Sequence, residues 1–255
     1  MQERFCELTD SEWEIIKEII DNQRKIKHEK RLILNAVLWI LTTGSQWRNL
    51  ESKYPPWQTV YYHYRQWRKR GIIEELLAFL AIRERKKAGR QALPSVVAID
   101  SQSVKIVQFT TQDKGIDGNK KVNGRKRHLA VDCLGIPWAV HITAANVADT
   151  TAGYGLAAKL KGKSSRLHTL KADHGYTDSF VEDVKREYGW RVEIVQKPES
   201  VKGFVPAGGR WVVERSYGWL NFKRRLSRDF EKNTESSEAM LQLAFIDMLL
   251  KRKTK

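Results

Sequence analysis

The stretch Val96–Asp100, with the sequence VVAID, decides the fold that this chain is predicted to adopt. Four consecutive apolar residues are typical of a strand buried on both faces, although a buried helix segment has the same pattern. Pro94 precedes the stretch and disfavours an established helix there. Asp100 would then lie where the strand leaves the core. There it either begins an ordinary turn or acts as a functional carboxylate.

The composition predicts a basic protein with a polyanionic partner. Of its 255 residues 41% are hydrophobic, enough for one large domain or for a medium domain beside a small one. The net charge of +16 favours nucleic acid, with an anionic membrane as the competing partner. No apolar run approaches the roughly 20 residues of a transmembrane helix, and residues 1–8 lack the apolar core of a signal peptide. Cys6 and Cys133 form neither a disulfide framework nor a zinc motif, which favours a reducing cytoplasm.

Residues 1–82 are predicted to form an all-α module. Thr9 and Glu12 have the spacing of a capping box, which marks a helix start. Further helices are expected over residues 30–43, 59–70 and 72–80. The helix over 59–70 combines tyrosines with basic residues, which suggests a helix-turn-helix-like DNA-binding module. The alternative is an ordinary helical subdomain whose aromatic residues fill its own core. In the DNA-binding interpretation the contacting side chains are Arg65, Arg68 and Lys69.

The pattern changes to strands after a basic linker over residues 83–93. Strands are expected over 96–100, 128–133, 137–144, 167–173 and 190–196, and helices over 150–160, 178–188, 211–228 and 235–250. Three strands come first, and helices then separate the later ones. This order predicts an α/β domain over 94–255, with a mixed five-stranded sheet and flanking helices.

Three carboxylates of this second domain are candidates for a common site. Asp100 and Asp173 each end a predicted strand, and Gly175 permits a sharp exit after the second. Glu214 lies on the predicted helix 211–228, on the same face as Tyr217. An acid in that position is either a buried ion-pair partner of a neighbouring arginine or a metal ligand.

Carboxylates in a basic protein suggest metal-dependent chemistry on DNA. Hard oxygen ligands suit Mg²⁺ or Mn²⁺. Two such ions, about 4 Å apart, activate an attacking water or 3′-hydroxyl and stabilise the leaving oxygen of a phosphodiester. The surrounding positive charge would hold the DNA backbone. The sequence has no CxxC pair, Walker loop, G-x-S-x-G motif or zinc-spaced histidine pair that would favour a different catalyst.

Seven stretches spread over nearly the whole chain carry a family resemblance. They are LTDSEWEII (8–16), RLILNAVLWILTTGSQWRNL (31–50), YPPWQTVYYHYRQWRKRG (54–71), AIDSQSVK (98–105), KKVNGRKRHLAVDCLG (120–135), ADHGY (172–176) and RWVVERSYGWLNFKRRLSRDFE (210–231). The chain resembles bacterial insertion-sequence transposases of the IS5 group in the DDE superfamily. The resemblance implies a ribonuclease-H-like catalytic domain. It also implies that Asp100, Asp173 and Glu214 are the catalytic acids and that they bind two Mg²⁺ or Mn²⁺ ions.

One signature of related groups, Y-R-E-K, is only partly present. Arg210 and Glu214 match it, but Ala207 stands in place of the tyrosine and Asn221 in place of the lysine. Lys223 or Arg224 is the candidate to take over the phosphate-binding role of that lysine. The carboxylates are unaffected by this departure.

Two basic clusters would extend the DNA contact. The first follows a glycine-containing loop over residues 115–119 and is either a solvated loop or a phosphate contact. The second follows Glu214 on the same predicted helix. The members are Lys120, Lys121, Arg125, Lys126 and Arg127 in the first cluster, and Lys223, Arg224 and Arg225 in the second, together with Arg210. The other acids of this region are expected to have structural roles in turns or loops, namely Asp113, Asp117, Asp132 and Asp149.

The sequence therefore predicts a DNA transposase that binds the inverted-repeat ends of its own insertion sequence. It would cleave them by metal-dependent attack and join the resulting 3′-hydroxyl to target DNA. Double-stranded DNA and a second copy of the chain are the expected partners, because two ends must be held together. The expected location is the prokaryotic cytoplasm, in association with the nucleoid. The alternatives are a domesticated, non-catalytic DNA-binding regulator and a structure-directed nuclease such as a resolvase.

Overall fold

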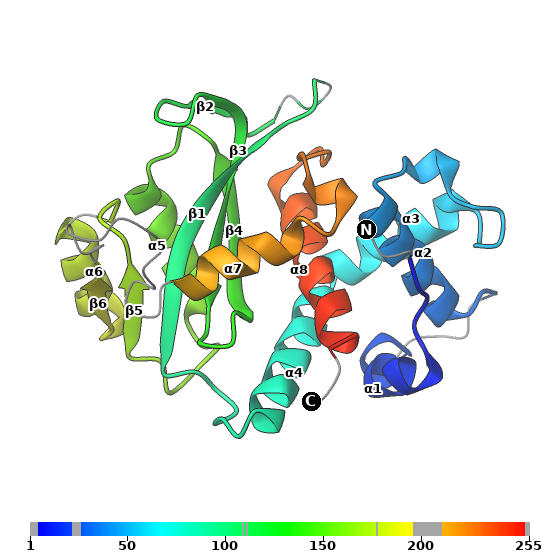
Figure 1. The fold of residues 1–255 in the computed structure, drawn as a ribbon, viewed down its shortest axis with the longest axis horizontal. Coiled ribbons are helices and arrows are strands. Elements are labelled where there is room, and N and C mark those ends of the chain that lie inside the picture. The colour runs from blue at the N-terminus through cyan, green and yellow to red at the C-terminus, as the bar shows by residue number, and fades with distance from the viewer. Residues whose placement is uncertain are drawn as a thin grey trace, which may run out of the picture. The chain divides into compact units, whose positions relative to one another are not determined.

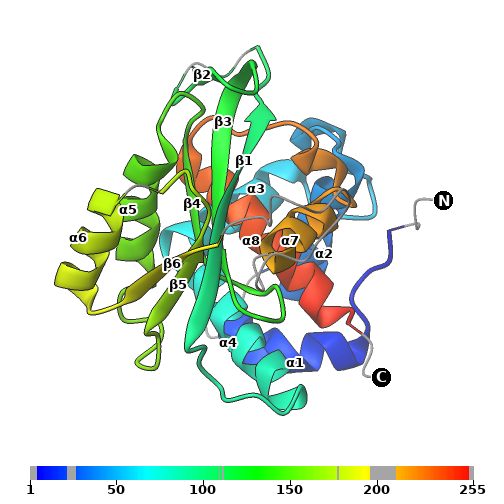
Figure 2. The same ribbon diagram turned by 60° about the vertical axis from the view of Figure 1, so that its left-hand side comes forward.

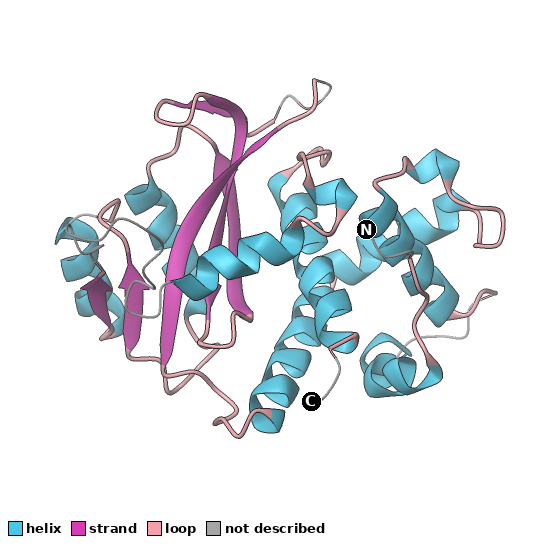
Figure 3. Cartoon of the chain, viewed as in Figure 1, coloured by secondary structure: helices cyan, strands magenta, loops and turns pink. Residues whose placement is uncertain are grey.

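The computed structural model describes residues 5–21, 27–108, 110, 112–176, 178–195 and 211–252 (Figure 1). It divides into two compact units. Unit 1 draws on residues 1–80, 220–227 and 239–255, and unit 2 on residues 81–219 and 228–238. All described strands belong to unit 2, whereas the described part of unit 1 is built from helices and loops (Figure 3). No helix among the described residues is both long and apolar enough to cross a membrane.

The helices of unit 1 are α1 (Asp10–Asp21), α2 (Lys30–Thr43), the short η1 (Trp47–Asn49), α3 (Trp57–Lys69), η2 (Arg224–Leu226) and parts of α4 (Ile72–Lys87) and α8 (Thr234–Leu250). Among them, α2, α3 and α8 begin and end close to their predicted limits, whereas α4 extends seven residues beyond its predicted end at residue 80. The capping box is confirmed, because the Thr9 N–H donates to Glu12 Oε2 at 2.7 Å and the Glu12 N–H donates to Thr9 Oγ1 at 3.3 Å. The all-α module is therefore confirmed.

The connection between α2 and α3 is longer than that of a compact helix-turn-helix. It runs over residues 44–56, whereas such motifs use a turn of about 3–4 residues. Gly44 ends α2 in the left-handed conformation, with φ 74°, and η1 then brings Trp47 to 5.4 Å from the ring of Tyr64. Packing of aromatic rings inside unit 1 therefore stabilises this longer connection.

The charged stretch after residue 82 is not a linker over its first part. Residues 83–87 are the last turns of α4, and Arg85 is buried there. Its guanidinium donates to the buried carboxylate of Asp132 at 2.7 Å and to the carbonyl of Gln91 at 2.8 Å. Asp132 also accepts the backbone N–H groups of Leu134 and Ile136, so its predicted role as a turn residue is confirmed.

The helix predicted over 211–228 is shorter in the structure. α7 (Trp211–Leu220) ends at Leu220, and η2 follows as a separate element. The side chain of Lys223 is largely buried in unit 1, where its ammonium donates to Asp247 of α8 and, at 3.2 Å, to Thr42 of α2. This buried ion pair explains why residues 220–227 group with unit 1, whereas the sequence placed them in one domain with residues 94–219.

Unit 2 contains a mixed sheet, as predicted, with one strand more than expected. The strands are β1 (Val96–Lys105), β2 (Gly115–Asp117), β3 (Val122–Val131), β4 (Pro137–Ala144), β5 (Thr169–Ala172) and β6 (Arg191–Ile194). β1 lies between antiparallel β3 and parallel β5, β4 is antiparallel to β3, and β6 is parallel to β5. The short β2 was predicted as a loop, and it extends the edge of β3 beyond β4.

Helices cover both faces of this sheet. α5 (Asp149–Leu160) and α6 (Asp178–Tyr188) lie on one face and α7 lies on the other (Figure 1 and Figure 2). Val97 and Ile99 of β1 are therefore almost completely buried, as the apolar run predicted. Asp100, which follows them, is partly exposed. The prediction that the strand ends at Asp100 is wrong, because β1 stays paired with β3 as far as Lys105.

Candidate active site

The register of the two central parallel strands brings Asp100 and Asp173 together. Ala98 of β1 pairs with Lys171 of β5, and two residues further along each chain come the two aspartates. Side chains two residues apart on a strand point to the same face, and neighbouring strands lie about 4.8 Å apart. Asp100 therefore lies within β1 and Asp173 directly after the end of β5, at corresponding positions of two adjacent strands.

Backbone N–H groups orient both carboxylates. Asp100 Oδ1 accepts the N–H of Ser101 at 2.8 Å, and Asp173 Oδ1 accepts the N–H of Gly175 at 3.0 Å. Both aspartates are only half-buried, so a ligand can approach them from solvent. Two carboxylates, one within β1 and one directly after β5, fit the ligand preference of Mg²⁺ or Mn²⁺.

Tyr217 attaches α7 to the strand that carries Asp100. Its hydroxyl lies 2.8 Å from the carbonyl oxygen of Asp100 and 2.7 Å from that of Arg127, and shares its hydrogen between them. Burial, with a smaller contribution from the Asp100 carboxylate, raises the pKa of Tyr217 well above its ordinary value. The hydroxyl is therefore protonated at every physiological pH and is a permanent donor.

Glu214 lies one turn before Tyr217 on α7, so the same contact places its helix over β1. The Glu214 side chain is exposed, which excludes the buried ion pair considered from the sequence. Its neighbour Arg215 lies over the rings of Trp211 and Trp219, at 4.5 and 4.9 Å from their centroids. Within the described residues no three acids, histidines or cysteines are already gathered as a metal site. The strand register thus places two of the three predicted acids at corresponding positions of β1 and of the turn after β5, and Glu214 lies on the helix that Tyr217 attaches to β1.

Several residues of the predicted basic clusters are buried instead of facing DNA. Arg125 is fully buried, and its guanidinium donates to the carbonyls of Glu231, Gln112, Lys232 and Asp113 at 2.9–3.3 Å, with Asp229 Oδ1 at 3.4 Å. Arg127 is 3% exposed, and burial lowers its pKa to about 10, so it stays charged. These two arginines, which the sequence predicts as phosphate contacts, are buried instead, and for Arg125 the loop residues 112–113 and 229–232 take the place of phosphate as partners.

The same correction applies to three other basic residues. Lys126 is 9% exposed and its ammonium is held by the carbonyl of Val147. In unit 1, Lys223 is paired with Asp247, and the buried Arg225 donates to the carbonyl of Ser45 at 3.3 Å. Buried cations of this kind stabilise the fold, and the structure gives no DNA access to them.

Other predicted contacts remain accessible. Lys120 and Lys121 at the β2–β3 turn, and Arg224 in η2, are exposed. On α3, Arg65 and Lys69 are exposed and Arg68 is half-buried, whereas Tyr64 and Trp67 are in the core. Arg210 lies outside the described residues.

Sequence reasoning missed the contribution of Tyr217 and of the residues that begin α5. Tyr217 was noticed only as a neighbour of Glu214. Its spacing of one helical turn from an acid was the available signal. Asp149 was expected in a loop but is the first residue of α5.

Two family models match the chain. Residues 8–77 match a family described as "Putative transposase of IS4/5 family", and residues 91–248 match one described as "Transposase DDE domain". A DDE domain has a ribonuclease-H-like fold, so the fold expected from the resemblance is confirmed together with the mixed sheet.

Two curated relatives are similar to parts of the chain. The "Putative transposase for insertion sequence element IS402" of Burkholderia cepacia is 32% identical over 127 residues, 47% of this chain and 60% of that protein. The "Uncharacterized protein y4sN" of Sinorhizobium fredii is 29% identical over 117 residues, 44% of this chain and 87% of that protein. The match thus spans less than two thirds of the Burkholderia protein. No solved structure matches the chain.

Proposed function

Because the chain belongs to the IS4/IS5-like DDE transposases, we propose that it binds the inverted-repeat ends of its own insertion sequence, cleaves them and joins them to target DNA. The observation that supports this proposal is the parallel register of β1 and β5, in which Asp100 and Asp173 each come two residues after the paired Ala98 and Lys171. The partner is double-stranded DNA, and two copies of the chain hold the two ends together. The prokaryotic cytoplasm, at the nucleoid, is the proposed location.

Each acid has a role in the proposed reaction. Asp100 and Asp173 bind divalent cations, two Mg²⁺ or Mn²⁺ ions, and Glu214 completes the ligand set from α7. When bound, these ions activate the attacking oxygen and stabilise the charge on the leaving oxygen. Tyr217 holds α7 to the backbone of β1 at Asp100, one helical turn from Glu214.

The exposed basic residues bind the DNA backbone in this proposal. Asp117 accepts the backbone N–H groups of Asn119 and Lys120, each at 3.0 Å, and the hydroxyl of Ser103 donates to the same carboxylate. These contacts fix the β2–β3 turn, so that Lys120 and Lys121 meet phosphate without a large loss of loop entropy. Arg224 and Arg210 are proposed as further phosphate contacts.

A cleavage assay separates the proposed enzyme from the non-catalytic regulator. Purified protein is incubated with supercoiled DNA that carries the inverted repeats flanking its gene, in Mg²⁺, in Mn²⁺ or in a chelator. We expect nicking at the repeats in either metal and none in the chelator. Binding of the repeats without nicking in either metal would favour the regulator, and nicking of branched DNA without preference for the repeats would favour a resolvase-like nuclease.

The exposed face of α3 is predicted to bind the element ends. Replacing Arg65, Arg68 and Lys69 with Ala should weaken binding to the ends. It should also reduce the dependence of log K on log salt by about 0.9 for each phosphate that the variant no longer neutralises. Fluorescence anisotropy at several salt concentrations measures both quantities. Unaltered affinity and slope would remove α3 from the interface.

The β2–β3 turn is predicted to bind DNA without reading sequence. Replacing Lys120 and Lys121 with Ala should weaken binding to element ends and to random DNA by the same factor. The matched control replaces Lys161 and Lys185, two exposed lysines of the same unit, and should leave binding near wild type. A reduction confined to the element ends would mean that the turn contacts bases.

A further inference from the structure

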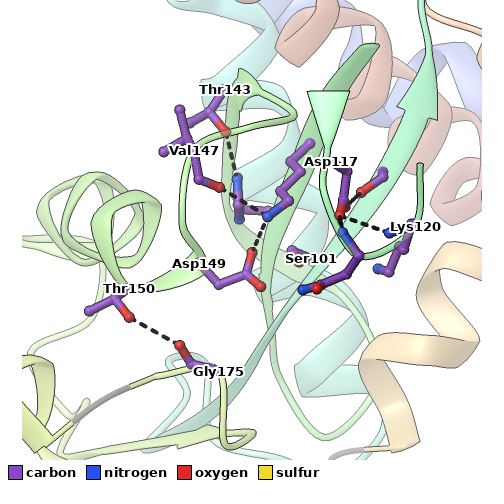
Figure 4. Close-up of polar contacts among 12 residues, drawn as sticks. Ser101, Asp117, Lys120, Thr143, Val147, Asp149, Thr150 and Gly175 are labelled. Atoms are coloured by element: carbon purple, nitrogen blue, oxygen red, sulfur yellow. Dashed lines mark hydrogen bonds and ion pairs between the residues drawn. The ribbon is translucent and has the colours of Figure 1, made fainter. Parts of the chain in front are cut away.

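The turn that carries Asp173 is held by contacts from two helices. The hydroxyl of Thr150, the second residue of α5, donates to the carbonyl of Gly175 at 3.0 Å (Figure 4). The Tyr176 N–H donates to the Asp173 carbonyl at 3.2 Å, and the buried Tyr176 ring packs 5.2 Å from Phe180 of α6. Residues 173–176 are therefore joined to the two helices that cover this face of the sheet.

Gly175 lies between two carboxylates. A Cβ atom at this position would lie 3.1 Å from Asp173 Oδ1 and 3.5 Å from Asp149 Oδ2. Asp149 and Asp173 therefore approach the same point of the chain from two different elements. Two like charges so placed repel each other unless a cation compensates one of them.

Lys126 supplies that compensating cation. From β3 its ammonium lies 3.3 Å from Asp149 Oδ1 and donates to the carbonyl of Val147 at 2.9 Å (Figure 4). The Lys126 side chain is 11% exposed and that of Asp149 is 30% exposed, so this ion pair is partly shielded from solvent. Lys126 thus neutralises Asp149 and fixes the residue that begins α5, next to the hydroxyl that binds Gly175.

We propose that Lys126, Asp149 and Thr150 are positioning residues for Asp173. They fix the turn after β5, so that the Asp173 carboxylate is already oriented when a cation arrives, and the ion pair of Lys126 with Asp149 reduces the repulsion between the two acids. This inference rests on the proposed metal-binding role of Asp173. The Thr150 contact is exposed and local, so its removal changes the turn and leaves the stability of the sheet nearly unaltered.

The test replaces Thr150 with Val, which removes the hydroxyl and keeps the shape, and Lys126 with Met. Hydrogen exchange of the peptide that contains residues 173–176 reports the turn, and electron paramagnetic resonance of Mn²⁺ reports binding by the full chain with end DNA. Removal of one hydrogen bond should accelerate exchange and weaken Mn²⁺ binding by about fivefold each. Thr150→Ser, which keeps the hydroxyl, should restore both values.

Two matched controls separate positioning from general structure. Thr151→Val changes the exposed threonine next to Thr150, and Lys159→Met removes a different lysine–carboxylate pair of α5, with Glu238. In both control variants, hydrogen exchange of residues 173–176 and the affinity for Mn²⁺ should equal those of the wild type.

The inference is overturned if Thr150→Val has wild-type exchange and wild-type Mn²⁺ affinity, or if it loosens the entire sheet to the same degree. An Asp173→Asn protein with wild-type Mn²⁺ affinity contradicts the proposed function itself. In that case faster exchange in Thr150→Val would still show that the contact fixes the turn, so the two failures are distinguishable.

Discussion

Replacing Asp173 with Asn is expected to lower metal-dependent nicking of end DNA by about 10³-fold or more. The substitution removes a negative charge from the proposed metal ligands. Metal stabilisation of the transition state is worth several kcal/mol, and each 1.36 kcal/mol equals about tenfold in rate. Folding should persist, because removing one of two neighbouring carboxylates relieves repulsion in the metal-free protein. Steady-state nicking in Mg²⁺ measures the effect, with gel-shift binding to the ends measured in parallel.

A matched control distinguishes this role from a general reduction of charge. Asp113→Asn removes an exposed acid from the same unit, at a position with φ 48° that asparagine tolerates. It should nick at a near-normal rate. Near-normal nicking by Asp173→Asn as well would contradict the assignment of the acids.

Replacing Arg125 with Met should destabilise unit 2 strongly. The substitution leaves four carbonyl oxygens and the buried carboxylate of Asp229 without the guanidinium. Breaking a buried ion pair by removing one partner costs about 3–5 kcal/mol. Since each kcal/mol lowers the melting temperature of a domain of this size by about 2–4 °C, the shift is measurable by calorimetry.

Lys120→Met is the matched control, because Lys120 is an exposed cation of the same sequence cluster. Its melting temperature should change little, since exposed substitutions stay within about 0.5 kcal/mol. If Arg125→Met had an unchanged melting temperature but bound DNA more weakly, Arg125 would be a DNA contact after all.

Local sequence patterns correctly predicted those helices and strands whose position depends on neighbouring residues alone. The apolar run before Asp100 predicted a buried strand, and the capping box at Thr9 predicted the start of α1. The strand Pro137–Ala144 and the helix Asp178–Tyr188 have their predicted limits. In each of these segments the hydrophobic period agrees with the tertiary packing.

Charge density did not predict exposure. Consecutive basic residues such as Arg125 and Lys126 suggested a DNA-binding cluster, but on a strand inside the sheet these side chains are buried. Their partners lie far along the chain, at Asp229 and Asp149, and no local pattern reveals such pairs. Long-range pairing also explains why α7 ends earlier than predicted, since Lys223 pairs with Asp247.

The family resemblance implied that Asp100 and Asp173 belong to one site. Their corresponding positions along β1 and after β5 follow from the register of the two strands, and the periodicity of the sequence does not determine that register. The same holds for Thr150 and Gly175, whose contact depends on where α5 begins relative to the turn after β5. Acids at strand ends are common, and only the three-dimensional arrangement distinguishes a structural acid such as Asp132 from a candidate ligand.

Metal-directed cleavage of the protein backbone tests most directly whether Asp100 and Asp173 hold one metal site. Fe²⁺ replaces Mg²⁺ in the complex with end DNA, and ascorbate with peroxide generates radicals that cut the chain beside the bound ion. We predict cuts near residues 100 and 173 that excess Mg²⁺ suppresses and that Asp173→Asn abolishes. Cuts elsewhere in the chain, or cuts at these positions that persist in Asp173→Asn, would contradict the assignment of Asp100 and Asp173 to one metal site.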